Sequence, residues 1–280
     1  MSENTISLYE TSEERARSAG WLPAWDGARY AANTGHHRAY DQLYLDTLPV
    51  RPTDRVLDLG CGSGDFTAIV AGLVPDGEVV GLDPQPSLLA ESRRRALANQ
   101  RFVEGSVQEL DALFPEDETF DVVMTRAVLQ WVPLVDHPGV LASARRLLRP
   151  GGWYRAEFGG AGNIPVILRL LDDVAAPLGG PRCPWTFADV GPYLELVERA
   201  GFALDGGFLR LTPQRRHFDR ESLMGWFHSQ AVQAYTTTMD PDAAAAFVRG
   251  VEARFDEMAR WDGTFDQTFV RMDLLGRRPA

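Results

Sequence analysis

The sequence predicts an α/β protein whose core is a doubly wound, mostly parallel sheet of seven strands with an inserted helical cap. Residues 55–59 are apolar on both faces, as in a central strand that helices cover on both sides. A glycine-rich loop at 60–64 follows at once, and a helical pattern begins at Asp65. Strand and helix patterns then alternate up to residue 158, which is the order that a doubly wound sheet requires.

The segment before the first strand combines a polar start with a group of aromatic residues. Residues 38–48 have helical spacing, and Pro49 would end that helix. The aromatic side chains fall within a short span: Trp21, Trp25, Tyr30, Tyr40 and Tyr44. We expect residues 1–50 to pack over the carboxyl edge of the sheet, although plain core packing explains Trp21 and Tyr44 as well.

The central alternation gives the next elements. Pro86 stands in the first turn of one predicted helix, and a Pro-Gly-Gly turn at 150–152 leads into the fifth strand. Strands are predicted at 55–59, 78–83, 101–105, 120–125 and 152–158, and helices at 65–73, 86–98, 107–113 and 138–148.

The last third predicts two further helices, at 162–176 and 189–200, and two strands. The sixth strand is expected at 202–211 and the seventh at 265–275, paired antiparallel. Residues 213–263 would then form the helical cap, and a connection of that length is usually functional. Its side chains suit an apolar chamber, although each alone is more often core: Trp226, Phe227, His228, Tyr235 and Met239.

The loop after the first strand predicts a nucleotide-sized site. Glycines at 60, 62 and 64 let the backbone turn sharply and lie against a ligand, and the following helix points its first N–H groups at the same crevice. Asp65 stands where a dinucleotide fingerprint needs its third glycine, which argues against a dehydrogenase. Asp83 follows about 20 residues after the loop, where a carboxylate can accept from two vicinal ribose hydroxyls.

Three stretches resemble the class I S-adenosylmethionine-dependent methyltransferases, whose sheet is Rossmann-like. They are Val-Leu-Asp-Leu-Gly-Cys-Gly-Ser-Gly at 56–64, Leu-Leu-Arg-Pro-Gly-Gly at 147–152, and Leu-Gln-Trp at 129–131. The third resembles small-molecule enzymes of the trans-aconitate methyltransferase type, and the likeness covers about residues 25–280. It implies S-adenosylmethionine as cofactor, a domain of residues 51–212 with 264–280, and a lid role for residues 1–50.

The resemblance also implies a cofactor site. Family members commonly carry an acidic residue at the place of Ser106, which would accept from the adenine amino group. Serine accepts more weakly, and a helix N-cap explains it equally well. The expected cofactor residues are Tyr30, Asp58, Gly60, Cys61, Gly62, Asp83, Pro84, Ser106, Val107 and Arg126.

The favoured function is O-methylation of a metabolite or of a secondary metabolite, for example in antibiotic biosynthesis. Gln130, Trp131, Trp185, Trp226 and Tyr235 are the expected acceptor-binding residues. A carboxylate acceptor needs no base, whereas a hydroxyl or ammonium group does, and the candidate bases are His36, His37 and His228. A C- or N-methyltransferase, a non-methylating natural-product enzyme and a non-enzymatic binding subunit stay open.

Composition excludes other classes of function. The net charge of -11 argues against a nucleic-acid partner, and the absence of lysine excludes Schiff-base and P-loop chemistry. Cys61 and Cys183 lie far apart without metal-ligand spacing, so no metal site is expected. We expect a cytoplasmic monomer or homodimer without membrane contact, since the sequence has neither a membrane-length apolar run nor an amino-terminal signal pattern.

Overall fold

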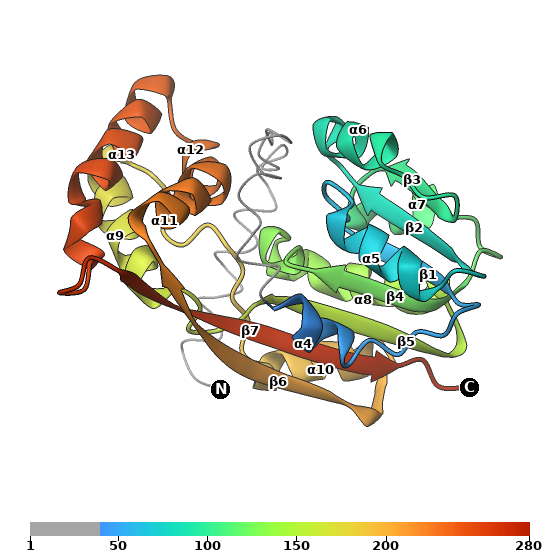
Figure 1. Ribbon diagram of the computed structural model, residues 1–280. Helices are drawn as coiled ribbons and strands as arrows, with labels where there is room; N and C mark the ends of the chain where they lie inside the picture. Colours follow the sequence, from blue (N-terminus) through green and yellow to red (C-terminus); the bar gives the residue numbers. More distant parts are fainter. Residues whose placement is uncertain (1–39) are drawn as a thin grey trace.

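The computed structural model describes residues 40–280, which form a seven-stranded sheet flanked by helices (Figure 1). The strand order is β3-β2-β1-β4-β5-β7-β6. The strands are β1 (Arg55–Leu59), β2 (Glu78–Asp83), β3 (Gln100–Glu104), β4 (Phe120–Arg126), β5 (Leu148–Gly159), β6 (Ala203–Phe218) and β7 (Phe265–Arg277). The predicted seven-stranded α/β sheet is therefore confirmed.

Strand direction places the crevice of this sheet. β1 pairs in parallel with β2 on one side and with β4 on the other, so the strand order reverses between β1 and β4. β7 lies antiparallel between β5 and β6. In doubly wound sheets, ligands bind outside the carboxyl ends of the strands at such a reversal.

Helices cover the two faces of the sheet. Val56 and Leu57 are both fully buried, but they belong to different apolar clusters on opposite faces. α4 (Asp41–Leu45) and α5 (Asp65–Leu73) pack on the Val56 side, and α7 (Leu110–Leu113), α8 (His137–Leu147) and α10 (Val190–Arg199) on the Leu57 side. α6 (Pro86–Arg94) packs beside β2 and β3. The burial of both residues explains why β1 is apolar throughout.

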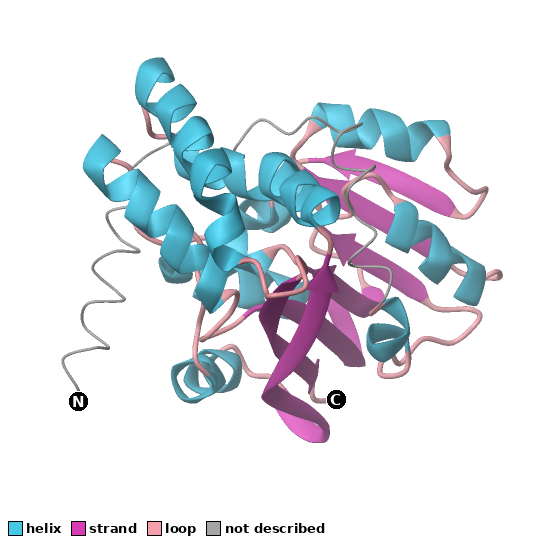
Figure 2. Cartoon of the chain, turned by 60° about the vertical axis from the view of Figure 1, so that its left-hand side comes forward, coloured by secondary structure: helices cyan, strands magenta, loops and turns pink. Residues whose placement is uncertain are grey.

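A third apolar cluster forms the cap. It joins α9 (Pro165–Ala175), α11 (Arg220–Trp226), the π-helix η5 (Phe227–Ala231), α12 (Val232–Thr236) and α13 (Pro241–Arg254) with the neighbouring ends of β6 and β7. The helices gather at the end of the sheet toward which the parallel strands run (Figures 1 and 2). The cap therefore stands beside the crevice.

Some predicted bounds were wrong. α6 ends at Arg94 rather than 98, α9 begins at Pro165 rather than 162, and α4 is shorter than the expected 38–48 helix. The largest difference is β6, which continues to Phe218 instead of ending at 211, so the inserted helices begin only at Arg220. Pro213 lies within β6, which is an edge strand, where a missing N–H is tolerated.

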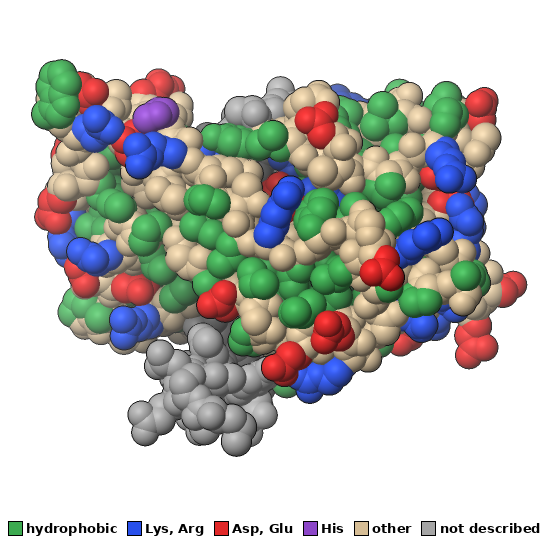
Figure 3. Space-filling model, turned by 90° about the horizontal axis from the view of Figure 1, so that it is seen from below, with side chains coloured by type: hydrophobic (Ala, Val, Ile, Leu, Met, Phe, Trp, Pro, Cys, Tyr) green, Lys and Arg blue, Asp and Glu red, His purple; other side chains and the backbone are tan. Residues whose placement is uncertain are grey.

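The outer surface shows no single dominant charge on the face that carries β6 and α10. On the described part of this face, arginine side chains alternate with aspartate and glutamate around a central group of hydrophobic side chains (Figure 3). None of the helices within residues 40–280 combines the length and apolar character needed to cross a bilayer. The same residues hold no group of three side chains suited to a metal ion.

Candidate active site

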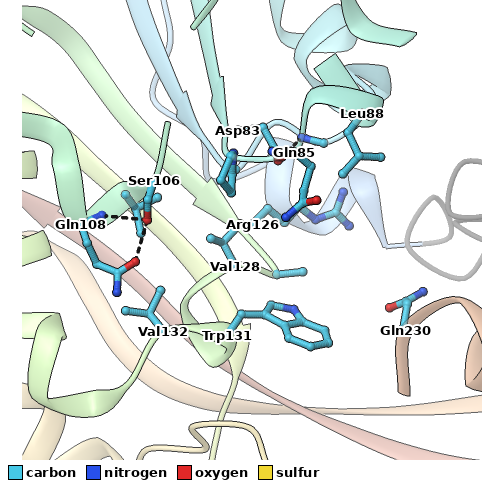
Figure 4. Close-up of a pocket in the computed structure, with 15 residues that line it drawn as sticks. Asp83, Gln85, Leu88, Ser106, Gln108, Arg126, Val128, Trp131, Val132 and Gln230 are labelled. Atoms are coloured by element: carbon cyan, nitrogen blue, oxygen red, sulfur yellow. Dashed lines mark hydrogen bonds between the residues drawn. The ribbon is translucent and has the colours of Figure 1, made fainter. Parts of the chain in front are cut away.

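The glycine loop between β1 and α5 forms the floor of a cleft of about 770 Å³. Gly60 and Gly62 have φ angles of 78° and 56°, and a Cβ on Gly60 would lie 2.2 Å from Val128 Cγ2. Glycine is therefore required at residue 60 both by its backbone angle and by the close approach. The described lining is Gly60, Gly62, Asp83, Pro84, Gln85, Leu88, Ser106, Val107, Gln108, Arg126, Ala127, Val128, Trp131, Val132 and Gln230 (Figure 4).

Asp83 ends β2 and lies in the wall of this cleft. Its Oδ2 accepts from the Gly62 N–H and its Oδ1 from the Gln85 N–H, both at 2.9 Å. Burial raises the pKa of Asp83 to about 6, although the two backbone N–H groups act in the opposite direction. Each carboxylate oxygen keeps a further lone pair, so Asp83 can still accept from a pair of ligand hydroxyls.

Asp58 and Cys61 are buried and fall outside the described lining of the cleft. Thr67 Oγ1 donates to Asp58 Oδ2 at 2.7 Å, which ties β1 to α5. Burial raises the pKa of Asp58 to about 7, with the nearby charge of Asp83 adding to the shift and the Thr67 hydrogen bond opposing it. Asp58 therefore joins β1 to the helix that follows the loop.

Ser106 caps the short helix Val107–Glu109 (η1). Its side chain accepts from the Gln108 N–H, and the Glu109 carboxylate accepts from the Ser106 N–H, which together form a capping box. The Ser106 hydroxyl donates to Gln108 Oε1 at 2.6 Å (Figure 4). The N-cap role is thus confirmed, and the adenine contact stays a prediction.

A second cavity, of about 370 Å³, adjoins the first and shares Trp131 and Gln230 with it. Aromatic rings make up much of its wall. Trp131 meets Trp185 edge-to-face at 5.8 Å between ring centroids, and Trp185 stacks on Phe187 at 5.9 Å. Its described lining is Gln130, Trp131, Asn163, Ile164, Trp185, Phe187, Trp226, Gln230, Phe269 and Arg271. We call this cavity the chamber.

Two buried arginines give the chamber end of the sheet a positive character. Arg271, on β7, is 3% exposed, and its Nε donates to Glu157 Oε1 at 3.0 Å. Arg216, on β6, lies between the rings of Tyr40 and Phe269, at 4.3 and 4.2 Å from their centroids. Burial, together with the charge of Arg271, lowers the pKa of Arg216 to about 9.

Neither guanidinium is fully hydrogen-bonded by residues 40–280. Within the described part of the chain, Arg271 Nη2 and Arg216 Nε and Nη1 are buried and have no hydrogen-bond acceptor. An unsatisfied buried donor of this kind costs about 1–3 kcal/mol or more when it is charged. The arrangement suits an anionic ligand that supplies the missing acceptors.

The turn that carries Gln130 and Trp131, η2 (Leu129–Trp131), is held from behind by His137. His137 Nε2 lies 3.1 Å from both the Leu129 and the Val132 carbonyl oxygens, so this nitrogen carries the proton. Its Nδ1 lies 3.1 Å from the Tyr193 hydroxyl, which donates to it. Burial lowers the pKa of His137 to about 4, so the ring is neutral and structural at physiological pH.

Comparison with known proteins decides the family. The model of a methyltransferase domain matches residues 56–152. The trans-aconitate 2-methyltransferase of Deinococcus radiodurans is 34% identical over 211 residues, which cover 72% of this chain and 78% of the relative. This chain belongs to the class I S-adenosylmethionine-dependent methyltransferases of the trans-aconitate methyltransferase type. The methyltransferase thus uses S-adenosylmethionine as its cofactor and a small molecule as its acceptor.

Other comparisons agree with this assignment. The trans-aconitate 2-methyltransferase of Variovorax paradoxus is 27% identical over 265 residues, which cover 91% of this chain and 99% of the relative. Among solved structures, the YcgJ protein of Bacillus subtilis covers 87% of this chain and all of its own, with a TM-score of 0.60 and 17% identity. That structural likeness concerns the fold of the methyltransferase alone.

The cleft brings together most of the predicted cofactor residues, and S-adenosylmethionine fits it through the glycine cradle and the free lone pairs of Asp83. Gly60, Gly62, Asp83, Pro84, Ser106, Val107 and Arg126 line it, whereas Asp58 and Cys61 do not. Tyr30 lies outside the described residues. Arg126 also forms an ion pair with Asp41 of α4 and stacks over the Phe66 ring at 4.7 Å. Arg126 therefore links α4 to the cofactor cleft of the methyltransferase.

The predicted acceptor residues divide into two groups. Gln130, Trp131, Trp185 and Trp226 line the chamber. Tyr235 lies behind Trp185, and its hydroxyl donates to Asp172 Oδ1 at 2.6 Å. His228 Nε2 lies 3.0 Å from Glu252 Oε1 and is outside the described lining of both cavities. His36 and His37 fall outside the described residues, so the histidine bases stay predictions.

The structure adds residues that sequence reasoning missed. Gln108 belongs to the cofactor cleft, and Asn163 and Arg271 belong to the chamber. Arg271 alternates with Phe269 and Asp273 along the seventh strand, which was a signal that these three share one face. The sequence pattern did not show that this face is buried beside the chamber.

Proposed function

We propose that this enzyme methylates a carboxylate oxygen of a small acid and thereby forms a methyl ester. The observation that carries the proposal is Arg271: its Nη2 lacks an acceptor among the described residues, in a chamber that adjoins the cofactor cleft through Trp131 and Gln230. A carboxylate bound by this nitrogen would have its charge compensated. The aromatic walls would enclose the carbon skeleton of the acid.

The available ionisable groups support an acceptor that needs no base. Asp83, Arg126 and Arg271 are the ionisable side chains in the described linings of the two cavities. Asp83 is engaged with the loop backbone, and a guanidinium group does not serve as a general base. When bound, S-adenosylmethionine supplies an activated methyl group. A carboxylate takes up a methyl group without losing a proton, so the residues need only orient it and exclude water.

The relatives suggest which acid to test first. Several of them are named trans-aconitate 2-methyltransferases, so we take trans-aconitate as the first acceptor for this chain. The Trp131, Trp185 and Trp226 side chains also suit an acid with a larger apolar part. O-methylation of a secondary metabolite is therefore part of the same proposal.

The test uses S-adenosylmethionine labelled in its methyl group. The full chain is incubated with trans-aconitate or with small carboxylic acids, and in parallel with matched alcohols and amines. We expect label in the acids that mild alkali releases as methanol, as it does from an ester. Alkali-stable label on the alcohols, the amines or carbon would contradict the proposal.

A further inference from the structure

The π-helix η5 interrupts the cap between α11 and α12 at Phe227–Ala231. A π-turn accommodates one more residue than an α-helical turn, and such turns are frequent at functional sites. Ser229, Gln230 and Ala231 are consecutive and all buried, and Phe227 is buried as well. A regular helix buries one stripe of residues, so the π-turn permits a polar side chain to enter beside the core residues.

That polar side chain is Gln230. It lies in the described linings of both the cofactor cleft and the chamber, and the other residue common to both is Trp131. In the close-up, Gln230 comes from the cap side and faces the space beyond Trp131 and Arg126 (Figure 4). Gln230 therefore lies at the junction of the two cavities.

The amide nitrogen of Gln230 is available for a ligand. Gln230 is 8% exposed, and its Nε2 has no hydrogen-bond acceptor among residues 40–280. Gln130, on the opposite wall, gives the comparison: its Nε2 donates to the Ala127 carbonyl at 2.9 Å, and its Oε1 accepts from the Gly159 N–H at 3.3 Å. Both ends of the Gln130 amide thus bind backbone, whereas the Gln230 Nε2 has no acceptor within residues 40–280.

We propose that Gln230 binds the acceptor at the junction of the two cavities and orients it for methyl transfer. Its Nε2 donates to one oxygen of the acceptor carboxylate, which leaves the other oxygen directed toward the cofactor cleft. Arg271 lines the chamber but not the described cleft, and its guanidinium compensates the negative charge of the carboxylate. This inference rests on the proposed function and adds a specific contact to it.

The test compares Gln230→Met and Gln230→Glu with the wild type. Methionine keeps the volume without the donor, and glutamate replaces the donor with a negative charge. Steady-state rates are measured with trans-aconitate, or with whichever small acid the wild type methylates, and S-adenosylhomocysteine affinity is measured by calorimetry. We expect kcat/KM to fall about tenfold in Q230M and further in Q230E, with S-adenosylhomocysteine affinity within twofold of wild type.

Gln233→Met is the matched control. Gln233 belongs to the same part of the cap, its Nε2 donates to the His228 carbonyl, and it lies outside the described lining of both cavities. Wild-type rates in Q230M and Q230E, or an equal fall in Q233M, would overturn the inference. A parallel loss of S-adenosylhomocysteine affinity in the Gln230 variants would overturn it too. Absence of wild-type turnover with every acid would instead overturn the proposed function, and this inference with it.

Discussion

The cofactor cleft and the chamber differ in how their buried polar groups are satisfied. In the cleft, Asp83 and Ser106 each have hydrogen-bond partners within the protein. Around the chamber, Arg271, Arg216 and Gln230 carry buried N–H groups without acceptors in the described part of the chain. All of these unpaired atoms are donors.

The difference shows where each site gains its selectivity. The cleft holds its donors and acceptors in place before the cofactor binds, which reduces the entropy lost on binding. The chamber has more hydrogen-bond donors than acceptors, and positive charge, in apolar surroundings. This destabilises the free protein and favours the binding of an anion. A site of this kind rejects substrates that cannot accept hydrogen bonds from its donors.

Removal of the Arg271 guanidinium should have the largest effect. In Arg271→Met we expect kcat/KM for the acid acceptor to fall at least about 100-fold, because the buried carboxylate loses its counter-charge. S-adenosylhomocysteine affinity should stay within a few-fold of wild type, since Arg271 lines the chamber and not the described cleft. Kinetics and calorimetry on the same preparation separate the two effects.

A second substitution controls for stability. Arg271→Met leaves Glu157 buried without its partner, which should destabilise the fold by about 3 kcal/mol. Glu157→Gln combined with Arg271→Met removes that unpaired charge and should recover most of the stability but none of the activity. Recovery of activity in the double variant would show that Arg271 acts through the fold alone.

Asp83→Ala tests the cleft side of the comparison. We expect S-adenosylhomocysteine affinity to fall tenfold or more, because the variant loses charged hydrogen bonds to the ligand hydroxyls and the restraint on the Gly62 N–H. The KM of the acid acceptor should change little at saturating cofactor. An unchanged affinity in calorimetry would mean that Asp83 only supports the loop.

Acidification should weaken cofactor binding through the same carboxyl. Because the pKa of Asp83 is raised to about 6, protonation removes its acceptor capacity, and S-adenosylhomocysteine affinity should fall up to about tenfold from pH 7 to pH 5. The unliganded fold should respond in the opposite direction. The native carboxyl binds its proton more tightly than the unfolded one, so this group stabilises the fold as the pH falls from 7 toward 4. Calorimetric titrations measure the pH dependence of S-adenosylhomocysteine affinity, and thermal melts measure the pH dependence of stability. Both are compared between wild type and Asp83→Asn.

Arg216→Met should stabilise the free protein and weaken the binding of an anionic acceptor in the chamber. The guanidinium is buried without a carboxylate among its described hydrogen-bond partners, so its replacement should raise the free energy of unfolding by about 1 kcal/mol despite the lost ring contacts. That is about a fivefold change in the folding equilibrium. Denaturant unfolding measures it, and a destabilised variant would show that the two rings and Gln214 already compensate the charge.

The smallest effect is expected for His228→Ala. His228 pairs with Glu252 and lies outside the described lining of the chamber, so kcat should change less than twofold with an acid acceptor. The KM of the acid and the affinity for S-adenosylhomocysteine should also stay close to the wild-type values. A large fall in kcat alone would restore His228 as a base and would argue for a hydroxyl acceptor.

Local sequence signals were sufficient to predict the elements that form the cleft. β1, α5 and β2 have the predicted bounds, because each is delimited by glycines or by a change of hydrophobic period within a few residues. Gly60 and Asp83 meet in the cleft because parallel strands bring their carboxyl ends to one edge of a sheet. The resemblance to known methyltransferases predicted further cofactor residues, such as Ser106 and Val107, which follow the third strand at that edge.

The acceptor half depends on contacts between distant parts of the chain. β6 exceeded its predicted end because pairing with β7, and not local propensity, continues it to Phe218. Arg216 and Arg271 belong to residue types that are usually exposed, so nothing local marks them as buried. Gln230 lines both cavities from an irregular helical turn that no local sequence pattern predicted.

The sequence by itself therefore determined the fold class and the glycine loop, since these depend on backbone turns and strand order, and its resemblance to known methyltransferases indicated the cofactor. Tertiary structure alone decided which polar side chains line the chamber. That choice depends on antiparallel register, on the packing of the cap and on one irregular helical turn, and each of these is set by contacts far apart in the chain.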